Sequence, residues 1–465
     1  MSRRQGVPTL IAILLIAIAI PACAVWWFQR SRDPSAGPAA NAPCLGTLGV
    51  EVSPIAASLR VQLGMPASLT GGRVAEVLPG SPAADAGLRM GDILVRIDEH
   101  DLANACEAVR ATRGLPCDRD VHVVVWRVGG TKGLAVRAVD EPSLLDAACA
   151  TGSPAACYRL AWARATVRGG AGETADASDV ERACVAGSAE ACAARGIALT
   201  SAGHPSGIPM LVSACQADHG AGCAQLGYLY ATGTLVERND TIAIRHYERS
   251  CEAGDASGCY NVALMYREAR GVRADLRRAI ETYERACRDG SAPACTDLGY
   301  VYERGEGVER DLERAFTLYR LGCDGSACSP SNRLACVNIG RAYRDGLGVP
   351  VSAASAAAFF EDACTRPTDP GDVDPAPHQA RACSLLGALY LAGTGVAPDA
   401  SDGLRFSVRG CEAGDAFGCF NAGVVHHTGQ GVPVDRAKAR EFYSLACDKG
   451  DAEACEAART VGPGQ

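Results

Sequence analysis

The chain has 465 residues, of which 48% are hydrophobic and 21% charged, and its formal net charge is −8. This composition is ordinary for folded soluble domains, and the length allows two or three of them. The acidic balance lacks the basic face that nucleic-acid binding requires, so we expect no nucleic-acid partner.

Cysteine usage departs from this ordinary composition, because the chain has 23 cysteines and only 8 histidines. Regularly spaced thiols in such number are typical of disulfides in an oxidising compartment, since the cytosol would keep them reduced. Metal binding is the alternative, but C-x2-C spacings are absent. We therefore predict an exported, disulfide-bonded protein with no bound metal and no cofactor.

The N-terminus is predicted to be a membrane anchor. Residues 10–28 form an uncharged apolar run that follows Arg3 and Arg4 and ends in three aromatic residues. A helix over this run nearly spans the hydrocarbon core of a bilayer. We expect residues 1–32 to form a membrane anchor or signal segment and residues 33–43 a linker, with the rest on the periplasmic or extracellular side. A lipoprotein signal with the lipid on Cys23 is the alternative.

Residues 44–140 alternate short β-like runs with Gly and Pro, which predicts a small β-rich α+β domain. The expected strands cover residues 48–52, 72–77 and 92–97, followed by a hairpin of 122–128 and 134–139 across residues 129–133. Asn104 is expected to cap a helix from 105 to about 113, which Gly114 would end.

The segment 77–94, V-L-P-G-S-P-A-A-D-A-G-L-R-M-G-D-I-L, resembles the PDZ domains of bacterial HtrA-like proteases. The resemblance implies that a peptide C-terminus, or an extended segment, binds by adding a strand to the edge of the sheet. The carboxylate-binding loop of such domains matches Thr47, Leu48, Gly49 and Val50 here, where successive backbone N–H groups would hold the carboxylate. The alternative is a domain that serves only as an internal docking surface.

The walls of this predicted groove come from one strand and one helix. Val50 and Val52 would line it from the strand, and Ala105, Val109 and Thr112, which share a helix face, would line it from the helix. The groove has no aromatic wall, so a small or medium aliphatic terminal residue is expected to fit best.

Cysteine pairs reveal an internal repeat across residues 141–465. From Cys223 onward, the second cysteine of one pair and the first of the next are always 28 residues apart, so the basic period is 36. Seven pairs are eight residues apart and two are longer: Cys149/Cys157, Cys184/Cys192, Cys215/Cys223, Cys251/Cys259, Cys287/Cys295, Cys411/Cys419, Cys447/Cys455, and the longer Cys323/Cys336 and Cys364/Cys383.

Each period is predicted to hold two helices joined by a G-x-G-V turn. The first helix places Cys295, Leu298, Gly299 and Tyr302 on one face, and the same positions recur in later repeats. This pattern resembles the cysteine-rich branch of the Sel1-like family, relatives of TPR repeats, best known in secreted bacterial proteins. The resemblance implies an all-α solenoid of helical hairpins that docks partner proteins, or in the alternative reading serves only as a spacer.

Each cysteine pair is predicted to be bridged locally, from the end of one helix to the start of the next. In six of the nine pairs a Gly follows the first Cys by three residues, where it would end the helix in a left-handed conformation. Cys328 also lies eight residues before Cys336, so Cys323–Cys336 and Cys328–Cys336 both stay open. The pairing of Cys44, Cys106 and Cys117 stays open as well.

Enzyme motifs are absent from the sequence, which has no G-x-S-x-G, P-loop, H-E-x-x-H or Ser-x-x-Lys. We expect His426, which stands at the repeat's Tyr position, to be a packed structural side chain, with a metal ligand as the alternative. The expected function is an exported, membrane-anchored scaffold that binds proteins or peptides. The alternative is a β-lactam- or peptidoglycan-directed enzyme, because members of the cysteine-rich branch are described as β-lactamase-like.

Overall fold

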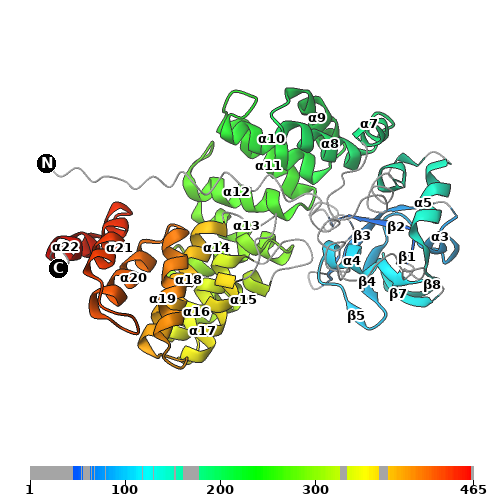
Figure 1. Cartoon of the computed structure of the whole chain (residues 1–465). Coiled ribbons are helices and arrows are strands. Elements are labelled where there is room, and N and C mark those ends of the chain that lie inside the picture. The colour runs from blue at the N-terminus through cyan, green and yellow to red at the C-terminus, as the bar shows by residue number, and fades with distance from the viewer. Residues whose placement is uncertain are drawn as a thin grey trace. The chain divides into compact units, whose positions relative to one another are not determined.

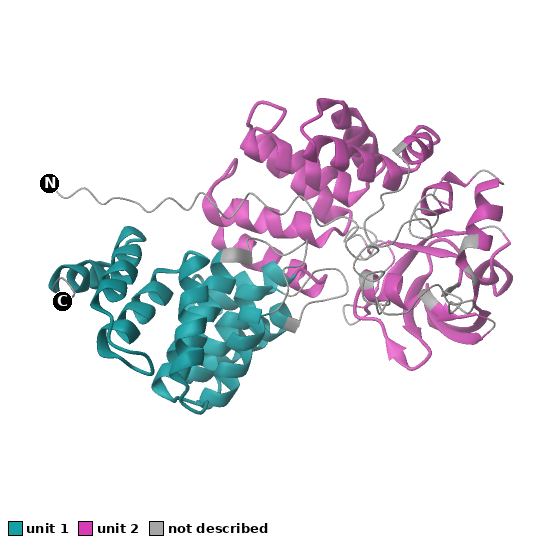
Figure 2. Ribbon diagram, viewed as in Figure 1, with its two compact units in different colours: residues 1–15, 292–325, 330–465 teal, residues 16–291, 326–329 magenta. Residues whose placement is uncertain are grey.

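The computed structural model describes three stretches of the chain, the first with short gaps. They are residues 45–160 (without 54, 56–62, 64, 67–68, 79, 118, 129, 151–152 and 155), 177–324 with 332–365, and 375–461. Two compact units divide at residue 291/292, as Figure 2 shows by colour.

The predicted membrane helix cannot be placed in this structure, because residues 10–28 and Cys23 lie outside the described residues. Within the described stretches, no helix is both long enough and apolar enough to cross a bilayer.

The described residues of the β-rich domain form two antiparallel sheets and two short helices (Figure 1). The larger sheet has the strand order β2-β3-β4-β7-β8 with β5 paired to β4, and the smaller has the order β6-β1-β9. Strand β2 therefore lies at an edge of the larger sheet. The elements are β1 (Leu45–Thr47), β2 (Val50–Ser53), β3 (Gly72–Val77), α3 (Pro82–Asp85), β4 (Ile93–Ile97), β5 (His100–Asp101), α4 (Ala105–Ala111), β6 (Arg113–Pro116), β7 (Asp120–Arg127), β8 (Gly130–Arg137) and β9 (Val139–Asp140).

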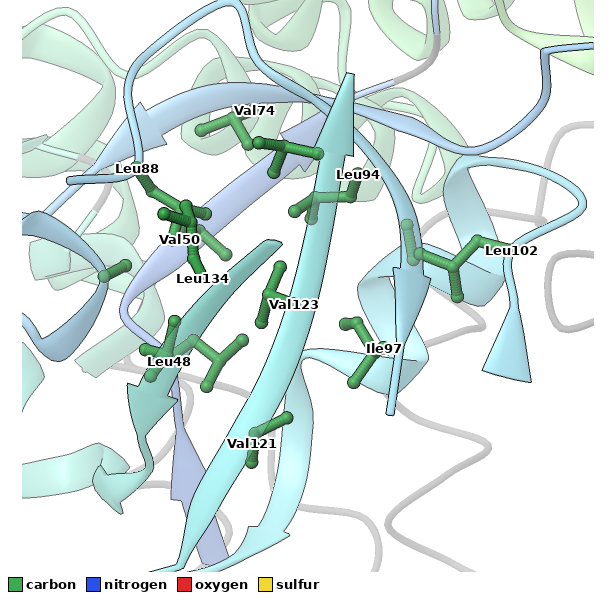
Figure 3. Close-up of a cluster of buried hydrophobic side chains, with 14 of the residues drawn as sticks. Leu48, Val50, Val74, Leu88, Leu94, Ile97, Leu102, Val121, Val123 and Leu134 are labelled. Atoms are coloured by element: carbon green, nitrogen blue, oxygen red, sulfur yellow. The ribbon is translucent and has the colours of Figure 1, made fainter. Parts of the chain in front are cut away.

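One cluster of aliphatic side chains forms the core of this domain (Figure 3). Leu94 on β4 and Val121 and Val123 on β7 are fully buried there, and Leu48 from the loop after β1 and Val50 from β2 join them. Alternate residues of β7 point inward, which is the period-two pattern of a half-buried strand.

Two boundaries of the predicted elements were wrong. The hairpin turn is shorter than expected, because Arg127 pairs with Gly130 and residues 131–133 belong to β8. Residues 130–133 at the start of β8 are all exposed, so this part of the strand lacks the alternation of buried and exposed residues that marks a strand in a sequence. Helix α4 ends at Ala111, since Arg113 already pairs with Thr47 of β1.

Helical hairpins make up the rest of both units (Figure 1). Unit 2 of Figure 2 holds, besides the β-rich domain, α5 (Glu141–Ala150), α7 (Ala177–Val185), α8 (Ala189–Ser201), the 3-10 turn η2 (Pro205–Gly207), α9 (Ile208–Gln216), α10 (Gly220–Thr232), α11 (Asp240–Glu252), α12 (Ala256–Glu268) and α13 (Leu276–Arg288). Unit 1 holds α14 (Ala292–Arg304), α15 (Leu312–Asp324), α16 (Arg333–Asp345), α17 (Ala353–Thr365), α18 (Pro375–Ala392), α19 (Ala400–Glu412), α20 (Ala416–Thr428), α21 (Arg436–Asp448) and α22 (Ala452–Thr460).

In a repeat, a glycine on the first helix packs against an aromatic ring on the second helix. A Cβ added to Gly299 on α14 would lie 2.7 Å from the ring of Tyr319 on α15, and Gly423 on α20 stands in the same relation to Tyr443 on α21. The missing side chain lets the ring lie directly on the backbone of the first helix. The glycine of the Leu-Gly pair in the repeat motif therefore allows the two helices to pack closely.

Local disulfides join consecutive hairpins, as predicted. Cys287 and Cys295 are disulfide-bonded, and so is Cys117. Cys323 rather than Cys328 is the partner of Cys336. The local bonds are Cys149–Cys157, Cys184–Cys192, Cys215–Cys223, Cys251–Cys259, Cys323–Cys336, Cys364–Cys383, Cys411–Cys419 and Cys447–Cys455.

Several of the bridged cysteines are buried, which their spacing in the sequence does not predict. Cys192 near the start of α8 is 2% exposed, and Cys259 near the start of α12 is fully buried. The sulfur of Cys192 also contacts the carbonyl of Cys184, and that of Cys259 contacts the carbonyl of Cys251. These residues are therefore not accessible sites on the surface, because each bond is a packed part of the interface between its two helices.

The predicted left-handed caps are present after the first cysteine of the described pairs. Gly187, Gly254, Gly414 and Gly450 have φ between 90° and 104°. Asp218 takes the equivalent position after Cys215, with φ of 55°. Where these turn residues are described, the staple therefore spans a turn in which a left-handed residue reverses the chain.

Candidate peptide-binding site

The loop between β1 and β2 directs the backbone N–H of Val50 away from β3. The carbonyl of Leu48 accepts from the N–H of Ala83 at 3.0 Å, and the carbonyl of Gly49 accepts from the N–H of Leu78 at 2.9 Å. In a planar trans peptide unit, the next N–H points opposite to the carbonyl. The N–H of Val50 therefore faces away from β3, where a carboxylate could approach it, whereas the N–H of Gly49 already donates to the hydroxyl of Thr47.

Thr47 ties this loop to the end of helix α4. Its hydroxyl accepts from the N–H of Gly49 at 3.3 Å and donates to the carbonyl of Thr112 at 3.4 Å. The hydroxyl of Thr112 donates to the carbonyl of Val109 at 3.0 Å. Thr47 therefore fixes the distance between the loop and the C-terminal end of α4, the two sides of the predicted groove.

Among the described strands, β2 pairs with β3 alone and ends the strand order of the larger sheet. Helix α4 lies against these two strands at Gly72 of β3, where an added Cβ would overlap Val52 and lie 2.8 Å from Cβ of Ala108 and 3.1 Å from Cα of Ala105. A side chain at residue 72 would thus push α4 away from the sheet. The glycine sets a narrow spacing between helix and strand.

The predicted site residues lie in these three elements, but most of their side chains are buried. Thr47, Leu48, Val50 and Thr112 are at most 2% exposed. Val52, Ala105 and Val109 are half-buried. The structure brings the loop, the edge of β2 and α4 together, and it leaves little open space for a large terminal side chain.

Two residues that sequence reasoning missed lie behind the carboxylate-binding loop. A Cβ at Gly49, whose φ is 78°, would overlap Ser81 and lie 2.8 Å from Cδ2 of Leu144 on α5. Ser81 belongs to the G-S-P motif and could have been suspected from it. Leu144 could have been noticed because no linker separates β9 from α5.

In the repeat array, rings at the repeat's Tyr position form stacked pairs. Tyr343 stacks on Phe359, Tyr390 on Phe406, and His426 on Phe442, with ring centroids 5.7–5.8 Å apart. Such offset pairs contribute about 0.5–1.5 kcal/mol beyond area burial. The ring at this position therefore packs on an aromatic ring of the next helix in each of these repeats, and His426 does so as well.

His426 also borders a hollow of about 880 Å³ at the start of α21, which is lined by Leu404, Val432, Pro433, Val434 and residues 435–438. Burial and the neighbouring Lys438 lower the pKa of His426 below its ordinary value, so the ring is neutral at pH 7. Within the described stretches, no group of three or more His, Cys, Asp or Glu side chains is placed to hold a metal ion.

Comparison with protein families agrees with the two-part architecture. The PDZ domain family matches residues 73–127, within the β-rich domain. The Sel1 repeat family matches six segments of the array: 220–255, 256–291, 292–326, 333–366, 380–415 and 416–451. The matched segments leave out the first two cysteine pairs, Cys149/Cys157 and Cys184/Cys192.

Curated relatives are similar to the chain only over its PDZ region. The magnetosome formation protease MamE of Magnetospirillum gryphiswaldense is 32% identical over 105 residues, which cover 21% of this chain and 14% of that protein. A probable periplasmic DegP-like serine endoprotease of Halomonas elongata is 38% identical over 109 residues, 23% of this chain and 21% of that protein. The chain thus spans less than a quarter of either relative.

Among solved structures, c5321 is similar to the chain in fold. It is a protective antigen of uropathogenic Escherichia coli that displays an SLR fold. The TM-score is 0.55 at 21% identity, and the match covers 69% of this chain and 67% of that one.

Proposed function

The chain carries a PDZ domain followed by Sel1 repeats, and on this premise we propose that it is a protein-interaction scaffold. The PDZ domain binds the C-terminus or an extended segment of a partner protein. The repeat array docks a second protein surface. In this proposal the PDZ domain occupies residues 44–140 and the array residues 141–465.

The orientation of the loop at Gly49 supports peptide binding. The N–H of Val50 faces away from β3 at the start of β2, which is the end strand of the larger sheet among the described residues. A peptide added along β2 would place its terminal carboxylate near this N–H and its backbone beside β2. These two features support a strand-addition site.

The ligand should end in a small aliphatic residue, because Val50 and Thr112 are almost fully buried and leave little room. Burying one such side chain contributes roughly 1.5–3 kcal/mol. A few strand hydrogen bonds add about 1 kcal/mol each. After the cost of ordering the peptide, micromolar affinity is expected.

A C-terminal peptide library screened against the whole exported chain tests the proposal. Val109→Glu places a charge on the groove side of α4 and should abolish binding without unfolding the domain. Val128→Glu is the matched control, because Val128 is 73% exposed and lies in the same domain away from α4. No binding tighter than about millimolar by the parent, or equal binding by the parent and Val109→Glu, would reject the groove as a peptide site.

Export to an oxidising compartment is also part of the proposal. The staples of the array need such a compartment to form and persist, and one PDZ-bearing relative is a probable periplasmic protein. Alkaline phosphatase fused after Gln465 should be active, since that enzyme needs export. A cytoplasmic reporter that is active at the same position would contradict export.

The enzyme alternative receives no support from these matches, because they identify a PDZ domain and Sel1 repeats. Relatives named as proteases align with the PDZ region alone. We therefore propose no catalytic activity for the chain. Nitrocefin or a cell-wall peptide should stay intact on incubation with the purified protein, as followed by mass spectrometry.

A further inference from the structure

We infer that the first stapled hairpin, α5 with residues 153–160, belongs to the peptide-binding unit and braces its carboxylate-binding loop through Leu144. This inference rests on the proposed peptide site and names a positioning residue for it. The binding unit then extends to about residue 160, beyond the end of the PDZ domain at residue 140.

Leu144 and Ser81 lie on the side of Gly49 to which a side chain at this residue would point. Gly49 is buried, and its missing side chain is what allows Ser81 and Cδ2 of Leu144 to approach it. The loop is thus held by one residue of the PDZ domain and one of the first hairpin. Moving Leu144 would leave Ser81 to support Gly49 without the contact from the hairpin.

An apolar cluster connects the same hairpin to the strand that holds the loop. Leu78, which follows β3, packs with Leu144, Leu145, Ala148, Ala156 and Leu160. The N–H of Leu78 is also the donor to the carbonyl of Gly49. Leu78 therefore links the two: its side chain packs on the hairpin, and its N–H holds the carbonyl of Gly49.

Two polar contacts add to this apolar packing. The hydroxyl of Ser153 donates to Oε1 of Glu76 on β3 at 2.9 Å, and Glu76 is paired in register with Glu51 of β2. Within the hairpin, Arg159 is 6% exposed and forms an ion pair with Glu141 at the start of α5. Because β9 ends at Asp140 and α5 begins at Glu141, no flexible linker separates the two parts.

The Cys149–Cys157 staple holds the two halves of the brace together. It joins the end of α5 to residues 156–160, and Cys149 packs against the cluster around Leu78. Opening this bond should loosen the cluster and the loop behind it. The Cys447–Cys455 staple in the other unit has the same spacing and is not a member of this cluster, so it is the matched control.

The test uses the whole exported chain with Leu144→Ala, Cys149→Ala/Cys157→Ala and the control Cys447→Ala/Cys455→Ala. Hydrogen exchange at the N–H groups of Leu78 and Ala83, the donors to the loop carbonyls, reports the brace without any ligand. Binding of a dye-labelled octapeptide ending in valine reports the site. We expect exchange and Kd to rise at least about tenfold in the first two variants and to stay unchanged in the control.

A general loss of folding is separated from a positioning effect by the central strand β7, whose exchange should not change. Leu144→Met keeps the side-chain volume and should restore parent behaviour. If Leu144→Ala does not fold, the same exchange and binding measurements are made on Leu144→Val, which removes less of the side chain. Unchanged exchange at Leu78 and Ala83, or equal loss across β7, would overturn the inference. A parent chain that binds no peptide would instead contradict the proposed function, and the exchange result would still decide the brace.

Discussion

The PDZ domain and the repeat array are stabilised in different ways. The domain gathers fifteen buried residues from most of its strands into one cluster. In the array, the cluster around Cys411 and Cys419 has four buried members and the one around Tyr443 has three. A repeat contacts only its neighbours, so it cannot draw on a distant core. The comparison indicates that the hairpins depend on their local staples, whereas the domain depends on long-range packing.

The largest expected effect comes from the domain core. Leu94→Ala removes a fully buried side chain that contacts residues from several strands, and it should cost about 2–5 kcal/mol of the domain's free energy of unfolding. Differential hydrogen exchange should show loss of protection across β3, β4 and β7 together. Protection in α20 and α21 should stay at the parent level. Equal loss in those helices would contradict the independence of the two regions.

Removing one staple should give a smaller and more local effect. Cys411→Ala/Cys419→Ala opens the turn between α19 and α20, and the chain-entropy argument gives a loss of roughly 2–3 kcal/mol. Exchange should rise in α19 to α21 and not in the PDZ strands. If the variant keeps parent protection in α19 and α20, small-residue packing alone holds the hairpins and the comparison fails.

A substitution in a turn inside a repeat should raise the free energy of unfolding, whereas the previous two substitutions lower it. Leu235 has φ of 63° at the position that Gly348 and Gly431 occupy in later repeats. Leu235→Gly should therefore stabilise its repeat by about 1 kcal/mol, since a left-handed side-chain residue costs about 1–2 kcal/mol. Gly348→Ala should destabilise, because its Cβ would overlap the carbonyl of Leu312. Thermal unfolding of the two variants should shift in opposite directions.

The smallest expected effect is a pH dependence confined to the array. Burial lowers the folded-state pKa of both His219 and His426, so the folded array binds fewer protons than the unfolded chain. The free energy of unfolding should then fall as the pH drops below about 6.5. His426→Tyr, which restores the residue of Tyr390, should reduce this slope by less than about 1 kcal/mol between pH 7.5 and 5.5. A parent array equally stable at both pH values would contradict this.

Much of the array could be predicted because cysteines and glycines carry its geometry. The 28-residue step between pairs implied that extra residues lie only inside the disulfide loops, and the bonds at Cys323–Cys336 and Cys364–Cys383 agree. The role of Gly299 could not be predicted from one helix. It depends on Tyr319, which lies twenty residues later on the partner helix.

The sequence predicted which elements form the candidate site. It did not predict the hydrogen bonds and contacts that hold those elements in place. Motif matching placed the loop at Thr47 to Val50 and the groove helix at Ala105. The direction of the loop N–H groups depends on hydrogen bonds from Leu78 and Ala83, which only the folded sheet brings together. The contact of Leu144 with Gly49 crosses a boundary that sequence motifs divide into two families, so neither motif could contain it.

The disulfide loops of unequal length have a consequence for how such a chain can change. The bridged Cα atoms are 4.7 and 4.8 Å apart in the loops of 13 and 19 residues, against 4.4–4.6 Å in those of eight. The staple presents the same two ends to the helices whatever lies between them, and a longer loop costs little extra entropy. These turns are therefore natural graft points, where evolution or an engineer could insert a foreign epitope while the helical frame stays in place.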